Sequence, residues 1–178
     1  MAGDDRMRLF CALQLPADVV QTLVEWQAEH VPAGRLVPAE HLHVTLAFLG
    51  ARPRAEVPEI KHELAEAAAG AGIVRLLAQR YRETGGVGMI VFDDVEGAGA
   101  TLAADLELRL EERGVYRREQ RPWLPHVTVT RFRERPRLSP PLPALGEVDA
   151  VRTALYCSTL RPSGARYDVL ESVALGGR

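Results

Sequence analysis

The chain has 178 residues, of which 47% are hydrophobic and 26% are charged, and its formal net charge is −2. This composition is typical of one globular domain or of two small lobes that share a core, and the charge argues against a large non-specific nucleic-acid surface. No apolar run reaches the roughly 18 residues that a membrane helix needs. The N-terminus, MAGDDRMRLF, lacks the basic segment and long apolar core of a signal peptide. We therefore expect a cytoplasmic protein without a membrane contact.

The spacing of apolar residues predicts strands, which alternate with period two, and helices, which repeat every three to four residues. In chain order we predict a strand (7–15), a helix (16–30), a loop (31–40), a strand ended by Gly50 (41–50), a helix (56–69), two antiparallel strands joined at Gly85 and Gly86 (73–84 and 87–95), a helix (98–112), a strand (126–132), and two final strands (146–158 and 166–175). This order indicates an α+β fold, because it lacks the repeated β-α units and the glycine-rich phosphate loop of a doubly wound sheet.

Arginine is concentrated in one segment of the chain. Residues 113–137 contain eight arginines and two glutamates, whereas the whole chain is slightly acidic. A basic segment on an acidic body indicates a local anion-binding site, although a solvated loop would have the same composition. Part of this segment, residues 113–121, should be a loop.

The two cysteines, Cys11 and Cys157, are far apart in the sequence, and neither belongs to a CxxC pair or a Cys/His cluster. Zinc sites and disulfide frameworks depend on such clusters. We therefore expect two buried free thiols, no metal site and no cofactor.

Two predicted strands contain nearly the same polar pattern, HLHVTLAFLG at 41–50 and PHVTVTRF at 125–132. Side chains of a strand alternate between its two faces. Alternation therefore predicts one polar face with His41, His43 and Thr45, and a second with His126, Thr128 and Thr130. The opposite faces should be apolar, with Leu42, Val44, Leu46 and Phe48 in the first strand and Val127 and Val129 in the second.

Two such strands that face each other would surround a small anion with imidazoles and hydroxyls. This arrangement suits in-line displacement at phosphorus without a metal, because one histidine can take a proton from water while the other protonates the leaving oxygen. Threonine hydroxyls would hold the non-bridging oxygens. Two alternatives remain open from the residues alone. The repeat can reflect a duplication without chemistry, or His41 and His43 can be two ligands of a metal.

The sequence resembles the two-histidine (2H) phosphoesterase superfamily, and in particular the bacterial and archaeal RNA 2′,3′-cyclic phosphodiesterases, formerly called 2′-5′ RNA ligases. The resemblance spans nearly the whole chain and rests on four stretches: RLFCALQLP, HLHVTLAFLG, RPWLPHVTVTR and SGARYDVLESVAL. It implies a bilobal α+β fold over residues 1–178, with two antiparallel-sheet lobes, outer helices, a central cleft and a pseudo-two-fold duplication. It also implies hydrolysis of an RNA 2′,3′-cyclic phosphate to a 2′-phosphate.

The resemblance assigns roles to four residues. His43 would be the proton donor and His126 the proton acceptor, while Thr45 and Thr128 would bind the phosphate. Four further residues are predicted to bind substrate: Arg131 as a phosphate ligand, Phe10 and Trp123 as stacking platforms for a base, and His41 as an RNA contact or a modulator of the His43 pKa. Core packing is the alternative for both aromatic residues. Strict alternation would turn Arg131 toward the apolar face unless the strand bends or ends before it.

The predicted partner is therefore an RNA with a 2′,3′-cyclic phosphate end, or a small cyclic nucleotide, bound by a monomer. RNA 2′-5′ ligation and hydrolysis of small cyclic nucleotides are the alternative reactions. A module that binds RNA ends without catalysis is the alternative from a different class of protein.

Overall fold

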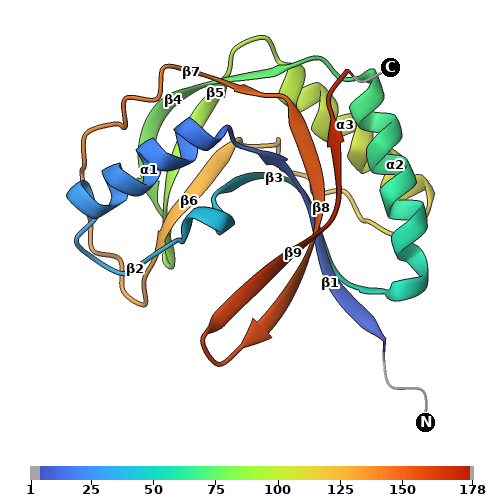
Figure 1. Cartoon of the computed structure of the whole chain (residues 1–178), viewed down its shortest axis with the longest axis horizontal. Helices are drawn as coiled ribbons and strands as arrows, with labels where there is room; N and C mark the ends of the chain where they lie inside the picture. Colours follow the sequence, from blue (N-terminus) through green and yellow to red (C-terminus); the bar gives the residue numbers. More distant parts are fainter. Residues whose placement is uncertain (1–4, 177–178) are drawn as a thin grey trace.

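The computed structural model describes residues 5–176, and the predicted α+β class is confirmed. Three α-helices and nine strands form within this range (Figure 1): β1 (Arg6–Gln14), α1 (Ala17–His30), β2 (Arg35–Leu36), β3 (His43–Pro53), α2 (Val57–Gly70), β4 (Val74–Glu83), β5 (Val87–Asp94), α3 (Ala98–Glu112), β6 (His126–Arg131), β7 (Glu147–Ala150), β8 (Arg152–Arg161) and β9 (Gly164–Ala174). Two 3₁₀ turns, Ala39–His41 and Arg54–Glu56, flank β3. Within the described residues, no helix has the length and apolar character needed to cross a membrane.

The strands form two antiparallel sheets, as predicted. One sheet has the order β3-β1-β8-β9, and the other has the order β2-β6-β5-β4-β7. The two strands that carry the repeated motif therefore belong to different sheets, and they pack against each other. This arrangement brings residues 43 and 126, about 80 positions apart in sequence, to one region of the molecule.

One apolar core joins the two sheets. Leu9, Leu13 and Leu155 enter it from the first sheet, and Leu76 and Ile90 enter it from the second. Helix α1 packs against β6, while α2 packs against α3 and against β8 and β9. The predicted stripe of α3, Leu102, Leu106 and Leu110, is buried as expected. Both cysteines are free and buried, as predicted, and burial raises the pKa of the Cys11 thiol to about 12.

The structure corrects several predicted boundaries. The predicted loop 31–40 contains the short strand β2. Strand β3 begins at His43, because His41 lies in a 3₁₀ turn, and it continues past Gly50 to Pro53. The predicted strand 146–158 is two strands in two sheets: β7 pairs with β4, and β8 pairs with β1 and β9. No glycine or proline separates the two strands, so the sequence gives no turn signal for the change of sheet at Val151.

Candidate active site

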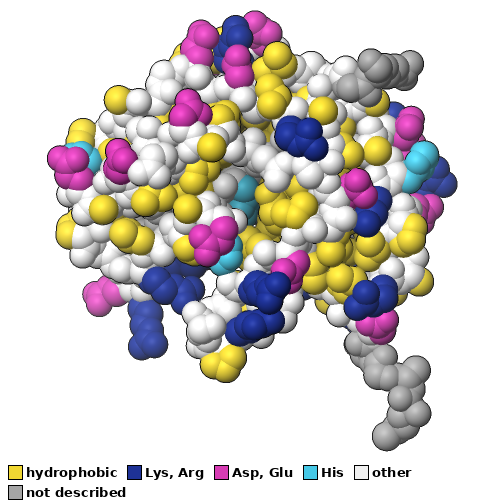
Figure 2. Space-filling view, in the orientation of Figure 1, with side chains coloured by type: hydrophobic (Ala, Val, Ile, Leu, Met, Phe, Trp, Pro, Cys, Tyr) yellow, Lys and Arg dark blue, Asp and Glu magenta, His cyan; other side chains and the backbone are white. Residues whose placement is uncertain are grey.

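A pocket of about 720 Å³ is lined by residues of both sheets. The lining residues include the predicted pair of histidines, His43 and His126, and the threonines Thr45 and Thr128. Figure 2 shows histidine side chains inside a hollow near the middle of one face, with Lys and Arg side chains gathered below it. The two motifs, which are distant in sequence, therefore contribute to one site.

Both histidines are oriented in the same way. His43 is the first residue of β3, and its Nδ1–H donates to the carbonyl of His41 at 2.7 Å. His126 is the first residue of β6, and its Nδ1–H donates to the carbonyl of Leu124 at 2.8 Å. Because a carbonyl only accepts hydrogen bonds, each neutral ring carries its proton on Nδ1 and keeps Nε2 available as a base. The Nε2 atom of His43 lies 3.1 Å from the Thr45 hydroxyl, which can donate to it.

Aromatic rings enclose the His43 imidazole. The centroid of Phe10 lies 4.9 Å from that of His43, and the rings of Tyr156 and Tyr167 lie 5.9 and 5.8 Å away. Removal of water from around the ring disfavours its charged form. Burial therefore lowers the pKa of His43 from 6.5 to about 4, although its hydrogen bond to the His41 carbonyl acts in the opposite direction. His43 is therefore neutral at pH 7.

His41 also lines the pocket, although it lies before β3 and not on its polar face as predicted. Its ring stacks on Tyr167 with a centroid distance of 4.0 Å. Burial lowers the pKa of His41; Glu40 opposes this effect, and the positive charges of Arg131 and Arg35 add to it.

A β-bulge explains how Arg131 reaches the pocket. Gly88 pairs with Thr130 and Met89 pairs with Thr128, so Val129 is an extra residue in β6. A bulge shifts the alternation of all side chains beyond it. The prediction that Thr130 shares the polar face is therefore wrong. Thr130 is fully buried, and Arg131 joins His126 and Thr128 at the pocket.

Strand β3 has a bulge at the equivalent position. Cys11 pairs with Ala47 and Ala12 pairs with Thr45, so Leu46 is the extra residue, three positions after His43, as Val129 is three positions after His126. Phe48 consequently leaves the predicted apolar face and lines the pocket with 46% of its surface exposed. Equal placement of both bulges fits the predicted two-fold duplication of the lobes.

The pocket contains four arginines, of which only Arg131 was predicted from the sequence. Besides Arg131, these are Arg8, Arg35 and Arg161, from β1, β2 and β8. Arg8 lies over the ring of Phe48 at 4.9 Å from its centroid. Single arginines in unrelated segments carry no motif, so no local signal distinguishes them from surface arginines.

Of the eight arginines in segment 113–137, only Arg131 lines the pocket. Other arginines of this segment form ion pairs instead, with distances from 2.8 to 3.6 Å: Arg113 with Glu63, Arg118 with Glu111, Arg121 with Glu119, and Arg135 with Glu83. Most arginines of this segment therefore lie outside the pocket.

The two predicted stacking residues occupy different environments. Phe10 lines the pocket, but only 3% of its surface is exposed, because its ring packs against Tyr156, Tyr167 and His43. Trp123 does not line the pocket. Its indole N–H donates to the carbonyl of Thr45 at 2.9 Å, and a Cβ added at Gly99 would lie 2.7 Å from its ring. Trp123 thus supports β3 from the side of α3, and we withdraw it as a stacking residue.

The pocket combines three imidazoles, five hydroxyl side chains and four guanidinium groups, and no Asp or Glu of the described residues lines it. In residues 5–176, no three His, Cys, Asp or Glu side chains are grouped so that they could hold a metal ion. Such a pocket offers proton transfer and hydrogen-bond donors to a phosphate. An α+β fold with this site defines the class of the protein, a phosphoesterase.

Comparison with known proteins agrees with this class. The family model described as LigT like Phosphoesterase matches residues 13–80. The RNA 2′,3′-cyclic phosphodiesterase of Thermus thermophilus is 36% identical over 96% of this chain and 91% of its own length. A crystal structure from the same organism has a TM-score of 0.83 at 32% identity and covers 96% of this chain and 99% of its own. Escherichia coli LigT in complex with 3′-AMP has a TM-score of 0.83 at 25% identity, over 97% of this chain and 99% of its own. The chain therefore belongs to the LigT-like phosphoesterase family.

Proposed function

We propose that the protein hydrolyses the 2′,3′-cyclic phosphate at an RNA 3′ end to a 2′-phosphate by a two-histidine mechanism that needs no metal. The observation that carries this proposal is the common pocket of His43 and His126, in which each ring is held by a backbone carbonyl through Nδ1. The Thermus thermophilus relative is named RNA 2′,3′-cyclic phosphodiesterase, which supports this choice of substrate.

In this mechanism Nε2 of His126 takes a proton from water, and the water oxygen attacks phosphorus. The bond between phosphorus and the 3′ oxygen breaks, and Nε2–H of His43 donates its proton to that oxygen. The product has a 2′-phosphate and a 3′-hydroxyl. Thr45 and Thr128 donate hydrogen bonds to the non-bridging oxygens, and Arg131 stabilises their negative charge. The Thr45 hydroxyl must then turn from His43 to the substrate.

The donor role of His43 requires a bound anion. Burial lowers the pKa of His43 to about 4, so its ring alone has no proton to give from Nε2 at pH 7. A phosphate beside the ring favours the imidazolium and raises the pKa again. Substrate binding would therefore charge the acid, and protonation of His43 would follow binding rather than precede it.

Two substitutions test the acid–base pair. His43→Ala and His126→Ala should each reduce the rate on an RNA with a 2′,3′-cyclic phosphate end by roughly 10²-fold or more. His62→Ala is the matched control, because His62 is exposed on α2 and does not line the pocket. Turnover should persist in EDTA. Full activity of either pocket variant, or loss in EDTA with rescue by zinc or manganese, would contradict the mechanism.

Product analysis separates the proposal from its alternatives. Hydrolysis as proposed gives a 2′-phosphate, whereas a longer strand formed from cyclic-phosphate and 5′-hydroxyl ends indicates 2′-5′ ligation. Turnover of small cyclic nucleotides, without turnover of RNA, would indicate a phosphodiesterase for small cyclic nucleotides. RNA binding that survives both histidine substitutions, without any product, would indicate a binding module.

We further propose that the protein is one domain of two lobes and acts as a monomer. The shared core of the two sheets supports a single domain. The two free, buried thiols fit the reducing conditions of the cytoplasm.

A further inference from the structure

The pocket has more positive charge than one cyclic phosphate needs. A 2′,3′-cyclic phosphate is a diester with one negative charge, but Arg8, Arg35, Arg131 and Arg161 all line the pocket, and no described acidic residue does. Arginine side chains in such excess commonly meet further phosphates of a nucleic-acid backbone. The question is which arginine lies beyond the reacting phosphate.

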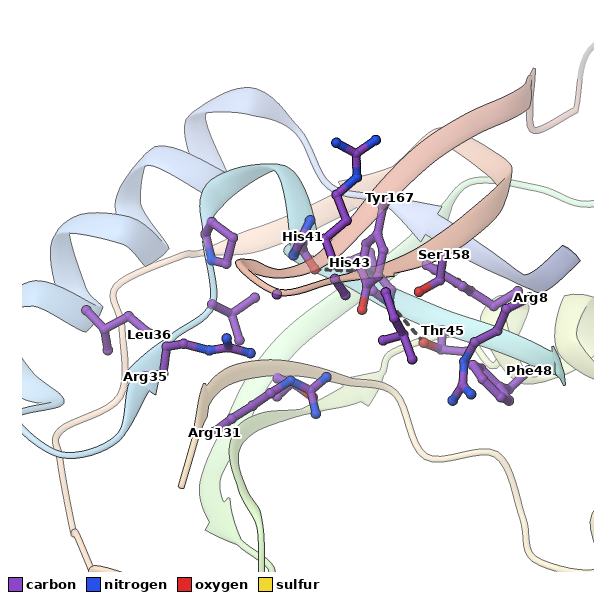
Figure 3. A pocket seen from close by; sticks show the side chains of 18 of the residues that line it. Arg8, Arg35, Leu36, His41, His43, Thr45, Phe48, Arg131, Ser158 and Tyr167 are labelled. Atoms are coloured by element: carbon purple, nitrogen blue, oxygen red, sulfur yellow. Dashed lines mark hydrogen bonds between the residues drawn. The ribbon is translucent and has the colours of Figure 1, made fainter. Parts of the chain in front are cut away.

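Arg35 and Arg131 stand directly opposite each other. The register of β2 on β6 pairs these two residues. Among residues 5–176, neither guanidinium has a carboxylate oxygen within 4.0 Å. Like charges at directly opposed positions destabilise a strand pair, so this pair favours a bound anion. Figure 3 shows both side chains directed from neighbouring strands toward the middle of the pocket.

The backbone at Arg35 is fixed to β6 by several buried contacts. The hydroxyl of Thr130 donates to the carbonyls of Ala33 and Arg35 at 3.1 and 3.3 Å. The buried amide of Gln27 donates to the carbonyls of Val37 and Val129 at 3.1 and 2.6 Å. A two-residue strand gains little stability from its own pairing. These contacts therefore hold the backbone of Arg35 in a defined position, which favours specific binding.

Arg35 also lies at the boundary between the lobes. A Cβ added at Gly164, the first residue of β9, would lie 3.2 Å from Nη1 of Arg35. Arg131 is on the same strand as His126 and Thr128, whereas Arg35 is one strand further out, about 5 Å away. Arg131 is thus placed for the reacting phosphate, and Arg35 is placed for the next phosphate along the RNA.

We infer that Arg35 binds the phosphodiester on the 5′ side of the terminal nucleotide, so that the substrate class is an RNA chain and not a mononucleotide. This inference rests on the proposed function and assigns Arg35 a specificity role that the reaction itself does not require. A single guanidinium can bind such a phosphate through two parallel hydrogen bonds.

The test uses a ribodinucleotide with a 2′,3′-cyclic phosphate end and either a normal phosphodiester or an uncharged methylphosphonate between its nucleosides. For the unaltered protein, kcat/KM should fall roughly 10-fold on the methylphosphonate, which is the effect of one lost charge-assisted hydrogen bond. For Arg35→Gln the same comparison should give less than a 2-fold difference, because the partner of the linkage charge is gone.

Arg121→Gln is the matched control, because Arg121 is 86% exposed and lies outside the pocket. It should retain the 10-fold effect, and circular dichroism should show that Arg35→Gln is folded. An equal effect of the methylphosphonate on the unaltered protein and on Arg35→Gln would overturn the inference, as would no effect on the unaltered protein. Failure of the unaltered protein to hydrolyse either dinucleotide would instead contradict the proposed function.

Discussion

At the scale of single residues, the two histidines share a hydrogen bond to the backbone that the sequence does not reveal. Each Nδ1–H is bound by the backbone carbonyl two residues earlier, at His41 and at Leu124. Every residue has a carbonyl, so this contact leaves no signature in the sequence. The meeting of the two His-x-Thr motifs in one site could be predicted from the sequence, because the repeated spacing suits chemistry at phosphorus. The environment that lowers the pKa of His43 could not, because Phe10, Tyr156 and Tyr167 come from other strands.

The protonation state of His43 can be measured directly. In the free protein, a titration followed by nuclear magnetic resonance should give His43 a pKa of about 4, since burial disfavours the charged ring. Saturating inorganic phosphate should raise this pKa by roughly 1 unit or more, because an anion within a few ångströms favours the imidazolium. Loss of the signal in His43→Gln assigns it. If phosphate binds and the pKa does not move, His43 is not the proton donor.

At the scale of elements, the two bulges determine which side chains enter the pocket. Strict alternation predicted Phe48 in the core and Thr130 at the site, and both predictions are wrong because Leu46 and Val129 are extra residues. The residue types do not mark either bulge: alternation continues through Val129 to Thr130, and Leu46 begins an apolar run that ends at Leu49. A bulge depends on the register with the partner strand, which is a long-range property. The fold class and most element positions could be predicted from the local sequence pattern, but the change of side-chain orientation beyond each bulge could not.

Gly34 allows β2 to approach β6, and this leads to a second prediction. Its φ is +85°, and an added Cβ would lie 2.6 Å from the carbonyl oxygen of Arg131. Gly34→Ala should therefore lower the free energy of unfolding by roughly 1–3 kcal/mol. It should also reduce kcat/KM on RNA, because Arg35 and Arg131 are displaced together. Urea unfolding and steady-state kinetics measure the two effects.

Gly70→Ala provides the control for this substitution. Gly70 is the last residue of α2, its φ is not positive, and an added Cβ would have no neighbour within 4 Å. Alanine at such a position should leave stability unchanged or raise it by about 0.4–1 kcal/mol. Equal stability of both alanine variants would show that the approach of β2 to β6 does not need glycine.

At the scale of the whole molecule, the two sheets behave as one structural unit. Their inner faces enter the same core, and the chain passes from the second sheet to the first at Val151, between β7 and β8. The duplicated motif predicted two lobes, but it did not predict how the lobes are joined. The chain crosses between the sheets four times, the last time at Val151, and the contact of Trp123 with the carbonyl of Thr45 ties the second motif to β3. Disruption of either sheet should therefore weaken both.

Leu155→Ala tests this cooperativity. Leu155 is fully buried on β8 in the first sheet, so its truncation should lower the free energy of unfolding by about 2–5 kcal/mol. Val169→Ala on neighbouring β9 is the control, since Val169 is 51% exposed and its truncation should change stability by no more than about 0.5 kcal/mol. If the core is one unit, amide hydrogen exchange in β4 and β5 of the second sheet should accelerate together with that in β1 and β8. Faster exchange confined to the first sheet would mean that the lobes unfold independently, and that a pocket built across them is held together only by its substrate.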